Sequence, residues 1–491
     1  MDEAWGSEAL FNRRKFLAGA AAFGLAPWRA AAFSQPVDKW NLLPALPKEK
    51  PLDFRMMADA FDAYVMNPDH GVVKRNQHGR QYFVSALEAT EDGGLTCFGP
   101  IAVGRELRNS GLEELSRSLL GYYSEPYGLF LDGPGATLCE YWYMMNVNAL
   151  AFALVRLRFA NSPEWMACVE RSAMRLRQIA QKIQYNFNDQ GYDFAKDAAW
   201  TKLDIYRQPD AIGGYSYVML LAWKLTGKDV FLVEAKTGID KYLAFDQNPW
   251  YEVPSGAMAT LAASYLQASG YAANADKALG FVLDANVGLM ATGEWGGRAV
   301  DGLMAGFCTE PKGQAYSMES MVALPYLIPA VRYRPELAEP VARYALNVAA
   351  NLRWFYPEYL PPENQSRPDL RAVVPYERLN RKDKGKSPYA EGDYAGHRSV
   401  YGGAYMMWLD KMAEPQGESW LLRWNLNTTN FLDHELAQAY LYYNPFSAAK
   451  RTRIEGAKRA KDLASGEMIA AKNGVIELEL KPIEARVMEV S

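Results

Sequence analysis

Carboxylates and aromatic side chains gather in residues 128–143 of this sequence. A Gly/Pro loop carries Asp132, and Glu140 follows beside Tyr141 and Trp142. The next segment, 144–157, is apolar on almost every side, which predicts a helix that is buried all round. A buried helix whose entrance carries an acid and aromatic rings is a natural floor for a binding pocket.

The same combination recurs before the other predicted buried helices. Aromatic faces stack on sugar rings, and acidic and basic groups hydrogen-bond to sugar hydroxyls. A carboxylate at a helix N-terminus is also ordinary capping, so any single acid has a structural explanation as well. The residues that we expect to bind substrate are Asp132, Tyr141, Trp142, Arg207, Asp210, Tyr251, Glu252, Trp295, Tyr316, Arg398 and Tyr401.

Paired carboxylates are the groups that cleave a glycosidic bond. They stand roughly 5 Å apart in retaining enzymes and about 6.5–9.5 Å apart in inverting ones. The sequence does not rank the candidates, which are Glu140, Glu310, Glu319, Glu391 and Asp393. An eliminating lyase would use a His or Tyr base instead. His397 is the histidine that lies at the predicted rim, and Tyr316, Tyr401 and Arg398 accompany it.

Two kinds of predicted helix alternate between Asp53 and about Trp408. One kind is amphipathic, as in 164–184, and the other is apolar or small on nearly every side. Strict alternation of one-sided and all-sided burial predicts a closed (α/α)6 double toroid, with the second kind inside. The amphipathic segments are 53–66, 112–122, 164–184, 229–245, 272–284 and 336–354, and the apolar ones are 98–109, 138–158, 210–226, 255–269, 316–331 and 397–412.

The pattern of apolar and polar residues changes after Met412. Residues 475–480 and 485–490 alternate between apolar and polar side chains, which predicts strands. We therefore expect three parts: a signal peptide over 1–32, a catalytic toroid over 33–412, and an antiparallel β module over 413–491. A long irregular insertion, 357–396, leads into the last apolar helix and has the length of a lid or binding loop.

The N-terminus predicts export. Arg13 and Arg14 precede a short apolar run and then Ala30 to Ala32, the pattern of a cleavable signal of the twin-arginine type. No other apolar run is long enough to span a bilayer. We expect a periplasmic or secreted protein that is not transmembrane.

The composition excludes several functions. The chain has 491 residues, 49% of them apolar, and a formal net charge of -4 without a basic face for nucleic acid. The sequence has no nucleotide-binding glycine loop, no GxSxG elbow, no HExxH motif and no EF-hand, so we expect neither cofactor nor metal. Four cysteines lie far apart, and nothing in their spacing requires a disulfide.

In its helix pattern and its acidic, aromatic helix entrances, the chain resembles the six-hairpin (α/α)6-toroid enzymes that act on glycans. The resemblance covers roughly residues 50–412 and implies a carbohydrate substrate. Residues 220–227 and 248–252 are also similar in texture to linalool dehydratase-isomerase, an exported (α/α)6 protein that works with cysteines and acids. Here Cys97, Cys139 and Cys308 fall near entrances of the apolar helices.

The leading hypothesis is an exported glycoside hydrolase that acts on an oligosaccharide or polysaccharide through a carboxylate acid/base pair. The alternatives are a polysaccharide or oligosaccharide lyase with a His or Tyr base, and a cysteine- and acid-dependent hydratase or isomerase of a small molecule. A periplasmic glycan-binding protein is the non-enzymatic alternative. The sequence leaves open the sugar, the linkage, the stereochemistry and the oligomeric state.

Overall fold

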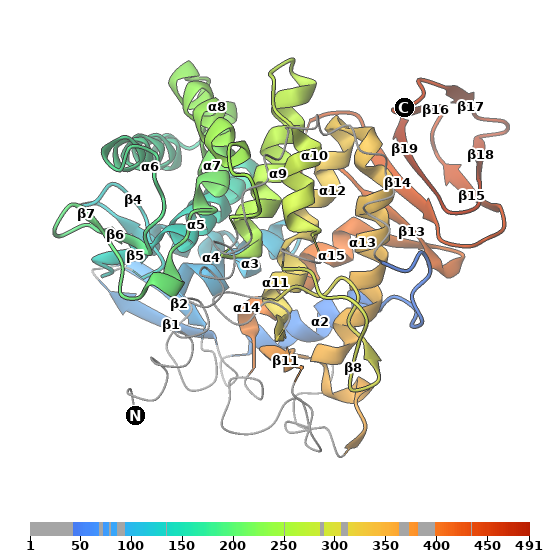
Figure 1. The fold of residues 1–491 in the computed structure, drawn as a ribbon, viewed down its shortest axis with the longest axis horizontal. Coiled ribbons are helices and arrows are strands. Elements are labelled where there is room, and N and C mark those ends of the chain that lie inside the picture. Colours follow the sequence, from blue (N-terminus) through green and yellow to red (C-terminus); the bar gives the residue numbers. More distant parts are fainter. Residues whose placement is uncertain are drawn as a thin grey trace, which may run out of the picture.

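The fold consists of a helical body and a C-terminal sheet (Figure 1). We describe it from a computed structural model. The described residues are 43–67, 72–77, 80–85, 94–133, 135–249, 251–284, 289–305, 313–362, 373–381, 398–433 and 435–491. The predicted signal peptide and much of the predicted insertion lie outside these ranges.

The apolar helices form the inner layer of the helical body. They are buried along almost their whole length because they carry no polar face. Each contacts the next in chain order, and the last contacts the first, so the contacts close into a circuit. The inner helices are α3 (Gly94–Leu107), α5 (Tyr141–Leu154), α7 (Ala211–Thr226), α9 (Val253–Ala268), α11 (Ser317–Val322) with α12 (Leu324–Tyr333), and α14 (Val400–Ala404) with α15 (Met406–Met412).

Most outer helices bury one face and expose the other, whereas α13 (Ala338–Asn351) is buried on nearly every side because strands of the C-terminal sheet also pack against it. In the longest, α6, Trp165, Val169 and Leu176 point into the core at helical spacing. The outer helices are α2 (Phe54–Val65), α4 (Glu113–Ser118) with the 3-10 turn η2 (Leu119–Tyr122), α6 (Pro163–Lys182), α8 (Asp229–Leu243), α10 (Ala275–Val282) and α13 (Ala338–Asn351).

The mainly helical architecture is confirmed, whereas the regular six-hairpin double toroid stays a prediction. The fifth inner segment is broken between α11 and α12, where Pro325 lacks the N–H that would continue the helix. The sixth is broken between α14 and α15, and the outer helix α4 has only six residues. None of the described helices combines the length and apolar character needed to cross a bilayer.

Short hairpins join the helices at several points. They are β1 (Val72–Gln77) with β2 (Arg80–Ser85), β3 (Tyr123–Ser124) with β4 (Leu129–Phe130), the sheet of β5 (Leu138–Glu140), β6 (Gly191–Asp193) and β7 (Ala198–Trp200), and β8 (Glu294–Trp295) with β9 (Arg298–Ala299). The long-range pair β10 (Gln314–Tyr316) with β11 (Arg378–Asn380) joins two entrance segments that are far apart in the sequence.

The C-terminal strands pack beside the helices, on the right in Figure 1. A six-stranded sheet has the order β12-β13-β14-β19-β16-β17, and a ribbon of β15 and β18 accompanies it. Trp424, Leu441 and Val487 belong to the same core as the helices, whereas Ile454 and Leu478 belong to a second, smaller core. The strands are β12 (Ala413–Gln416), β13 (Glu418–Asn425), β14 (Ala439–Asn444), β15 (Lys450–Glu455), β16 (Arg459–Asp462), β17 (Met468–Ala470), β18 (Val475–Leu480) and β19 (Glu484–Val490).

Candidate active site at the inner-helix entrances

Side chains from distant parts of the chain cap the N-termini of inner helices. Asp132 lies in the loop after β4 and caps α3, because its Oδ1 accepts hydrogen bonds from the Thr96 N–H (2.7 Å) and hydroxyl (2.6 Å). Gln208 caps α5, since its Oε1 accepts from the Trp142 N–H at 2.8 Å. These bonds satisfy backbone donors that have no partner within their own helix.

Two carboxylates cap α9. Asp210, the residue before α7, accepts at Oδ2 from the N–H groups of Tyr251 and Glu252, both at 2.9 Å. Glu319, on α11, accepts at Oε2 from the N–H of Val253 at 2.8 Å. Asp132, Asp210 and Glu319 therefore each have a structural role as caps of helix N-termini. A role in substrate binding or catalysis stays a prediction for each.

Glu140 stands just before α5, between two amide side chains. Gln190 donates to its Oε1 at 2.8 Å, and Gln208 donates to its Oε2 at 2.5 Å. Gln208 is fully buried, so it fixes the carboxylate relative to the Trp142 N–H that it also binds. Burial raises the pKa of Glu140, and the two amide hydrogen bonds oppose that rise because they favour the ionised form.

Glu252 and Glu319 form a pair of buried carboxyl groups. Their side chains hydrogen-bond to each other, and they are 6% and 2% exposed. Burial raises the pKa of Glu319. Two carboxylates in direct contact cannot both be ionised at low cost, so this arrangement favours a protonated carboxyl group in the pair. The N-terminus of α9 lies beside the pair and favours its remaining negative charge.

Three tyrosines surround Glu252. Its negative charge raises the pKa of Tyr143, Tyr316 and Tyr401, although burial is the larger cause for each phenol. Tyr143 and Tyr401 are partly exposed. The charges of Asp132 and Glu140 also raise the pKa of Tyr143, so this tyrosine is within electrostatic reach of acids from two helix entrances. All three phenols stay protonated at neutral pH and can donate hydrogen bonds to a ligand.

Glu377 is an acid that the sequence reasoning missed. It immediately precedes β11, and its backbone C=O accepts from the N–H of Ser317 at 3.0 Å, at the start of α11. Burial raises the pKa of its carboxyl to about 7, while Ser399 and Arg378 act in the opposite direction. Within the described chain its Oε2 has no hydrogen-bond partner. Tyr376 beside it repeats the acid-and-aromatic signal of the other entrances, and this signal could have found it.

Tyr143 belongs to the aromatic entrance of α5 but is not among the residues predicted to bind substrate, and its predicted neighbours are buried in packing contacts. Trp142 packs against the Tyr143 ring with centroids 3.9 Å apart, and Tyr141 is buried edge-on against Phe187. Tyr251 is 4% exposed and lies at the cap of α9.

Three further residues predicted to bind substrate, Arg207, Arg398 and Trp295, make contacts in the segments around the helix entrances. Arg207 pairs with Asp189 (2.8 Å) and Asp204 (3.1 Å). Arg398 donates to the hydroxyl of Tyr64, and Trp295 lies buried in the β8–β9 hairpin. Four predicted catalytic residues, Glu310, Glu391, Asp393 and His397, lie outside the described residues.

The described cysteines are free thiols. Cys97, Cys139 and Cys168 are all buried. Burial and the nearby charges of Asp132 and Glu140 raise the pKa of Cys139 well above its ordinary value. The reactive form of a cysteine is the thiolate, which this environment disfavours. Among the described residues, no group of three or more His, Cys, Asp or Glu side chains is arranged to hold a metal ion.

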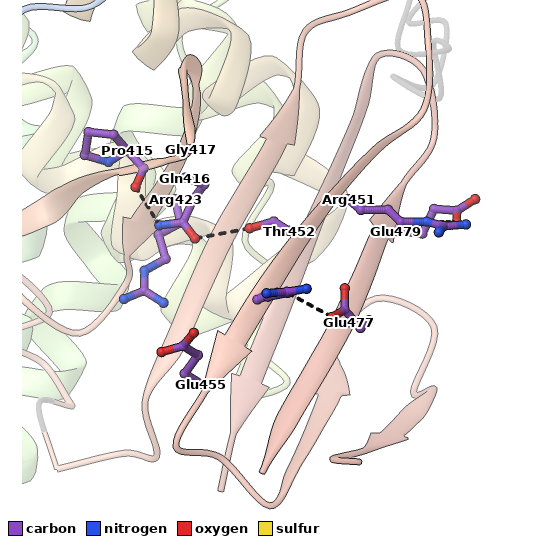
Figure 2. Close-up of a pocket in the computed structure, with 10 residues that line it drawn as sticks. Pro415, Gln416, Gly417, Arg423, Arg451, Thr452, Glu455, Glu477 and Glu479 are labelled. Atoms are coloured by element: carbon purple, nitrogen blue, oxygen red, sulfur yellow. Dashed lines mark hydrogen bonds and ion pairs between the residues drawn. The ribbon is translucent and has the colours of Figure 1, made fainter. Parts of the chain in front are cut away.

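A separate hollow of about 1040 Å³ lies on the β module (Figure 2). Its charged side chains pair with one another, as in Arg451–Glu479 (3.0 Å) and Arg453–Glu477 (2.9 Å). These four side chains are more than half exposed, so their pairs are screened by water and stabilise little. Carboxyl groups are buried together at the helix entrances and not at this hollow, which makes the entrances the candidate site.

No family model matches the chain, and no curated protein matches it significantly. Similar solved structures include a sugar epimerase from a ruminal bacterium (11% identity, TM-score 0.45, covering 73% of this chain and 98% of that one). They also include a family 76 glycoside hydrolase from a bovine Bacteroides thetaiotaomicron strain (9%, TM-score 0.47, 73% and 77%). A third is cellobiose 2-epimerase from Spirochaeta thermophila DSM 6192 (8%, TM-score 0.43, 73% and 96%). At this level of similarity they carry no argument about the reaction.

Proposed function

We propose that the chain is an exported glycoside hydrolase, with Glu252 as the proton donor and Glu140 as the base or nucleophile. The observation that carries the proposal is the buried, hydrogen-bonded pair of Glu252 and Glu319, together with Tyr143, on which the charges of both Glu140 and Glu252 act. Cleavage of a glycosidic bond needs one protonated and one ionised carboxyl group, and this arrangement supplies both.

The roles follow from the surroundings of each acid. Glu319 holds the proton of the pair close to Glu252, so Glu252 can pass it to the oxygen of the leaving sugar. Two amide donors fix both oxygens of Glu140 and favour its ionised form. Glu140 would therefore activate a water or attack the anomeric carbon directly.

The tyrosines favour hydrolysis over elimination by a tyrosine base. A base must lose its proton, and the raised pKa values of Tyr143 and Tyr401 oppose this at neutral pH. As hydrogen-bond donors, the two phenols can hold sugar hydroxyls between the acids. A lyase in which His397 is the base stays an alternative, and so does the cysteine-dependent enzyme.

The test compares Glu140→Gln, Glu252→Gln and Glu319→Gln with a matched control, Glu113→Gln. Glu113 is an exposed acid on α4 that pairs with Arg117. Each protein is incubated with neutral and acidic oligosaccharides and polysaccharides, and new reducing ends and ultraviolet absorbance from unsaturated uronate are followed. We expect reducing ends without absorbance. Loss of Glu140 or Glu252 should lower kcat by at least about 100-fold, the lower end of the usual gain from proton transfer.

Glu319→Gln has a different expected effect. The amide introduced in this variant would donate to Glu252 and favour its ionised form, so the alkaline limb of the pH profile, which the proton donor Glu252 governs, should move to lower pH while some activity remains. Full activity in all three variants would overturn the assignment. Absorbance together with reducing ends would show a lyase, and inhibition by thiol alkylation would favour the cysteine-dependent alternative.

A Glu377→Gln variant tests whether Glu377, rather than Glu252, is the proton donor. Glu377 lies near Tyr401 and has its pKa raised to about 7, so it could also supply a proton. With Glu252 as the donor, Glu377→Gln should keep a kcat within about tenfold of the original protein. A larger loss in Glu377→Gln than in Glu252→Gln would transfer the donor role to Glu377.

A further inference from the structure

A small hollow lies beside the cap of α9, lined by residues at the ends of α7, α8, α9 and α10. Its volume is about 10 Å³. Val253, Phe281, Val282 and Leu289 form its apolar walls. Its polar lining residues are Asp210, Tyr242, Asn248 and Glu252.

Two polar atoms at this hollow are buried without a partner. The Oδ1 of Asp210 and the hydroxyl of Tyr242 have no hydrogen-bond partner among the described residues. The two residues are 1% and 0% exposed. A buried polar group without a hydrogen-bond partner destabilises the folded protein, and more so when it is charged, so native proteins rarely leave one.

We propose that one water molecule occupies this hollow, donating to Asp210 Oδ1 and binding the hydroxyl of Tyr242. A volume of about 10–15 Å³ by this measure is what a single water needs, together with two to four polar partners. The side chains of Asn248 and Glu252 line the same space and can complete its hydrogen bonds. A larger ligand does not fit.

The water would act as a positioning element for α9. It binds one oxygen of Asp210, and the other oxygen accepts from the N–H groups of Tyr251 and Glu252. A water bound to Oδ1 would therefore hold the Asp210 carboxylate in one orientation, and through Oδ2 it would hold the backbone of Glu252 in place. The charged and titratable groups that face Asp210 are Glu252, Glu319 from α11 and Tyr242 from α8. The hollow and its polar atoms alone carry the proposal, which holds whatever reaction the protein catalyses.

The direction in which Tyr242→Phe changes the melting temperature tests the proposal. Tyr242→Phe removes the hydroxyl and little else. If a water is bound, the variant loses a hydrogen bond, and its melting temperature should fall by roughly 1–2 °C. If the hollow is dry, removal of an unsatisfied hydroxyl should leave the melting temperature unchanged or raise it. The matched control is Tyr344→Phe, because the Tyr344 hydroxyl is also buried without a described partner but does not line this hollow.

A second variant fills the hollow. A Cβ added at Gly256 would stand 3.2 Å from the Tyr242 hydroxyl and 3.1 Å from Val282 Cγ2. A Cβ at Gly214, on α7, would meet Met145 Cβ at an equal 3.1 Å away from the hollow, which makes Gly214→Ala the matched control. A crystal structure of the original protein should show the water, and one of Gly256→Ala should not. A dry hollow in the original protein, or a rise in melting temperature for Tyr242→Phe, would overturn the proposal.

Discussion

Replacing Asp210 by Asn should change how the stability of the protein depends on pH. Asn keeps the carbonyl oxygen that accepts from Tyr251 and Glu252 but has no proton to lose. In the original protein, burial is the main cause that raises the pKa of Asp210 from 3.8 to about 7. The charge of Glu319 adds to this rise, and the hydrogen bonds from the backbone N–H groups oppose it.

The size of the effect follows from this difference in pKa. Below about pH 4 the carboxyl is protonated in the folded and the unfolded chain, so its contribution to stability is fully present. Between about pH 4 and 7 the unfolded chain loses the proton and the folded chain keeps it, so stability falls as pH rises. From 3.8 to about 7, at about 1.36 kcal/mol for each unit of pKa, the loss is on the order of 4 kcal/mol. A water donating to Oδ1 would favour the ionised form and make the loss smaller.

The assay is urea unfolding of both proteins at pH 4, 6 and 8. Asp210→Asn and the original protein should be about equally stable at pH 4. At pH 8 the variant should be the more stable by up to about 4 kcal/mol. Other buried acids also have raised pKa values, including Glu377 and Glu140, but they are present in both proteins, so their contributions cancel in the comparison. Equal pH dependence in the two proteins would refute the reasoning.

Two further predictions concern the support of the site. Gln208→Ala removes a cap of α5 and a hydrogen-bond donor to Glu140. The variant should lose about 0.5–2 kcal/mol of stability, and the pKa of Glu140 should rise. If the acid limb of kcat/KM does not move to higher pH, the prediction is wrong. Arg332→Ala should cost about 2–4 kcal/mol in thermal unfolding, because Arg332 is buried on α12 and pairs with Glu489 of β19 at 2.7 Å. The control is Arg451→Ala in an exposed pair, with a cost below about 1 kcal/mol; equal losses in the two variants would show that Arg332 does not anchor the sheet.

Much of the helical body could be predicted because burial leaves a period in the sequence. The predicted segment 210–226 is α7 (Ala211–Thr226), and the predicted 229–245 is α8 (Asp229–Leu243). The breaks could not be predicted from the same signal, because a broken inner segment is as apolar as a continuous one. At the fifth inner segment, Pro325 was the local sign of a break.

The site was harder to predict because its contacts connect distant residues. Capping rules look three residues along the chain, whereas Asp132 caps a helix 36 residues before it and Glu319 caps one 66 residues before it. Glu377 reaches the site through the pairing of β11 with β10, some 60 residues earlier in the chain. Periodicity reports which face of an element is buried, and it contains no information on which distant element covers that face.

The long-range caps explain how an acid can serve chemistry at a helix N-terminus, where acids ordinarily serve structure. Glu252 directly precedes α9, the position from which a side chain usually caps its own helix. Its side chain makes no such bond: the first N–H of that helix, on Val253, already donates to Glu319, and Pro254 at the next position has no N–H. The Glu252 carboxyl instead hydrogen-bonds to Glu319. The positive end of the α9 dipole lies beside the pair and stabilises its negative charge, so the entrance can keep two carboxyl groups buried together.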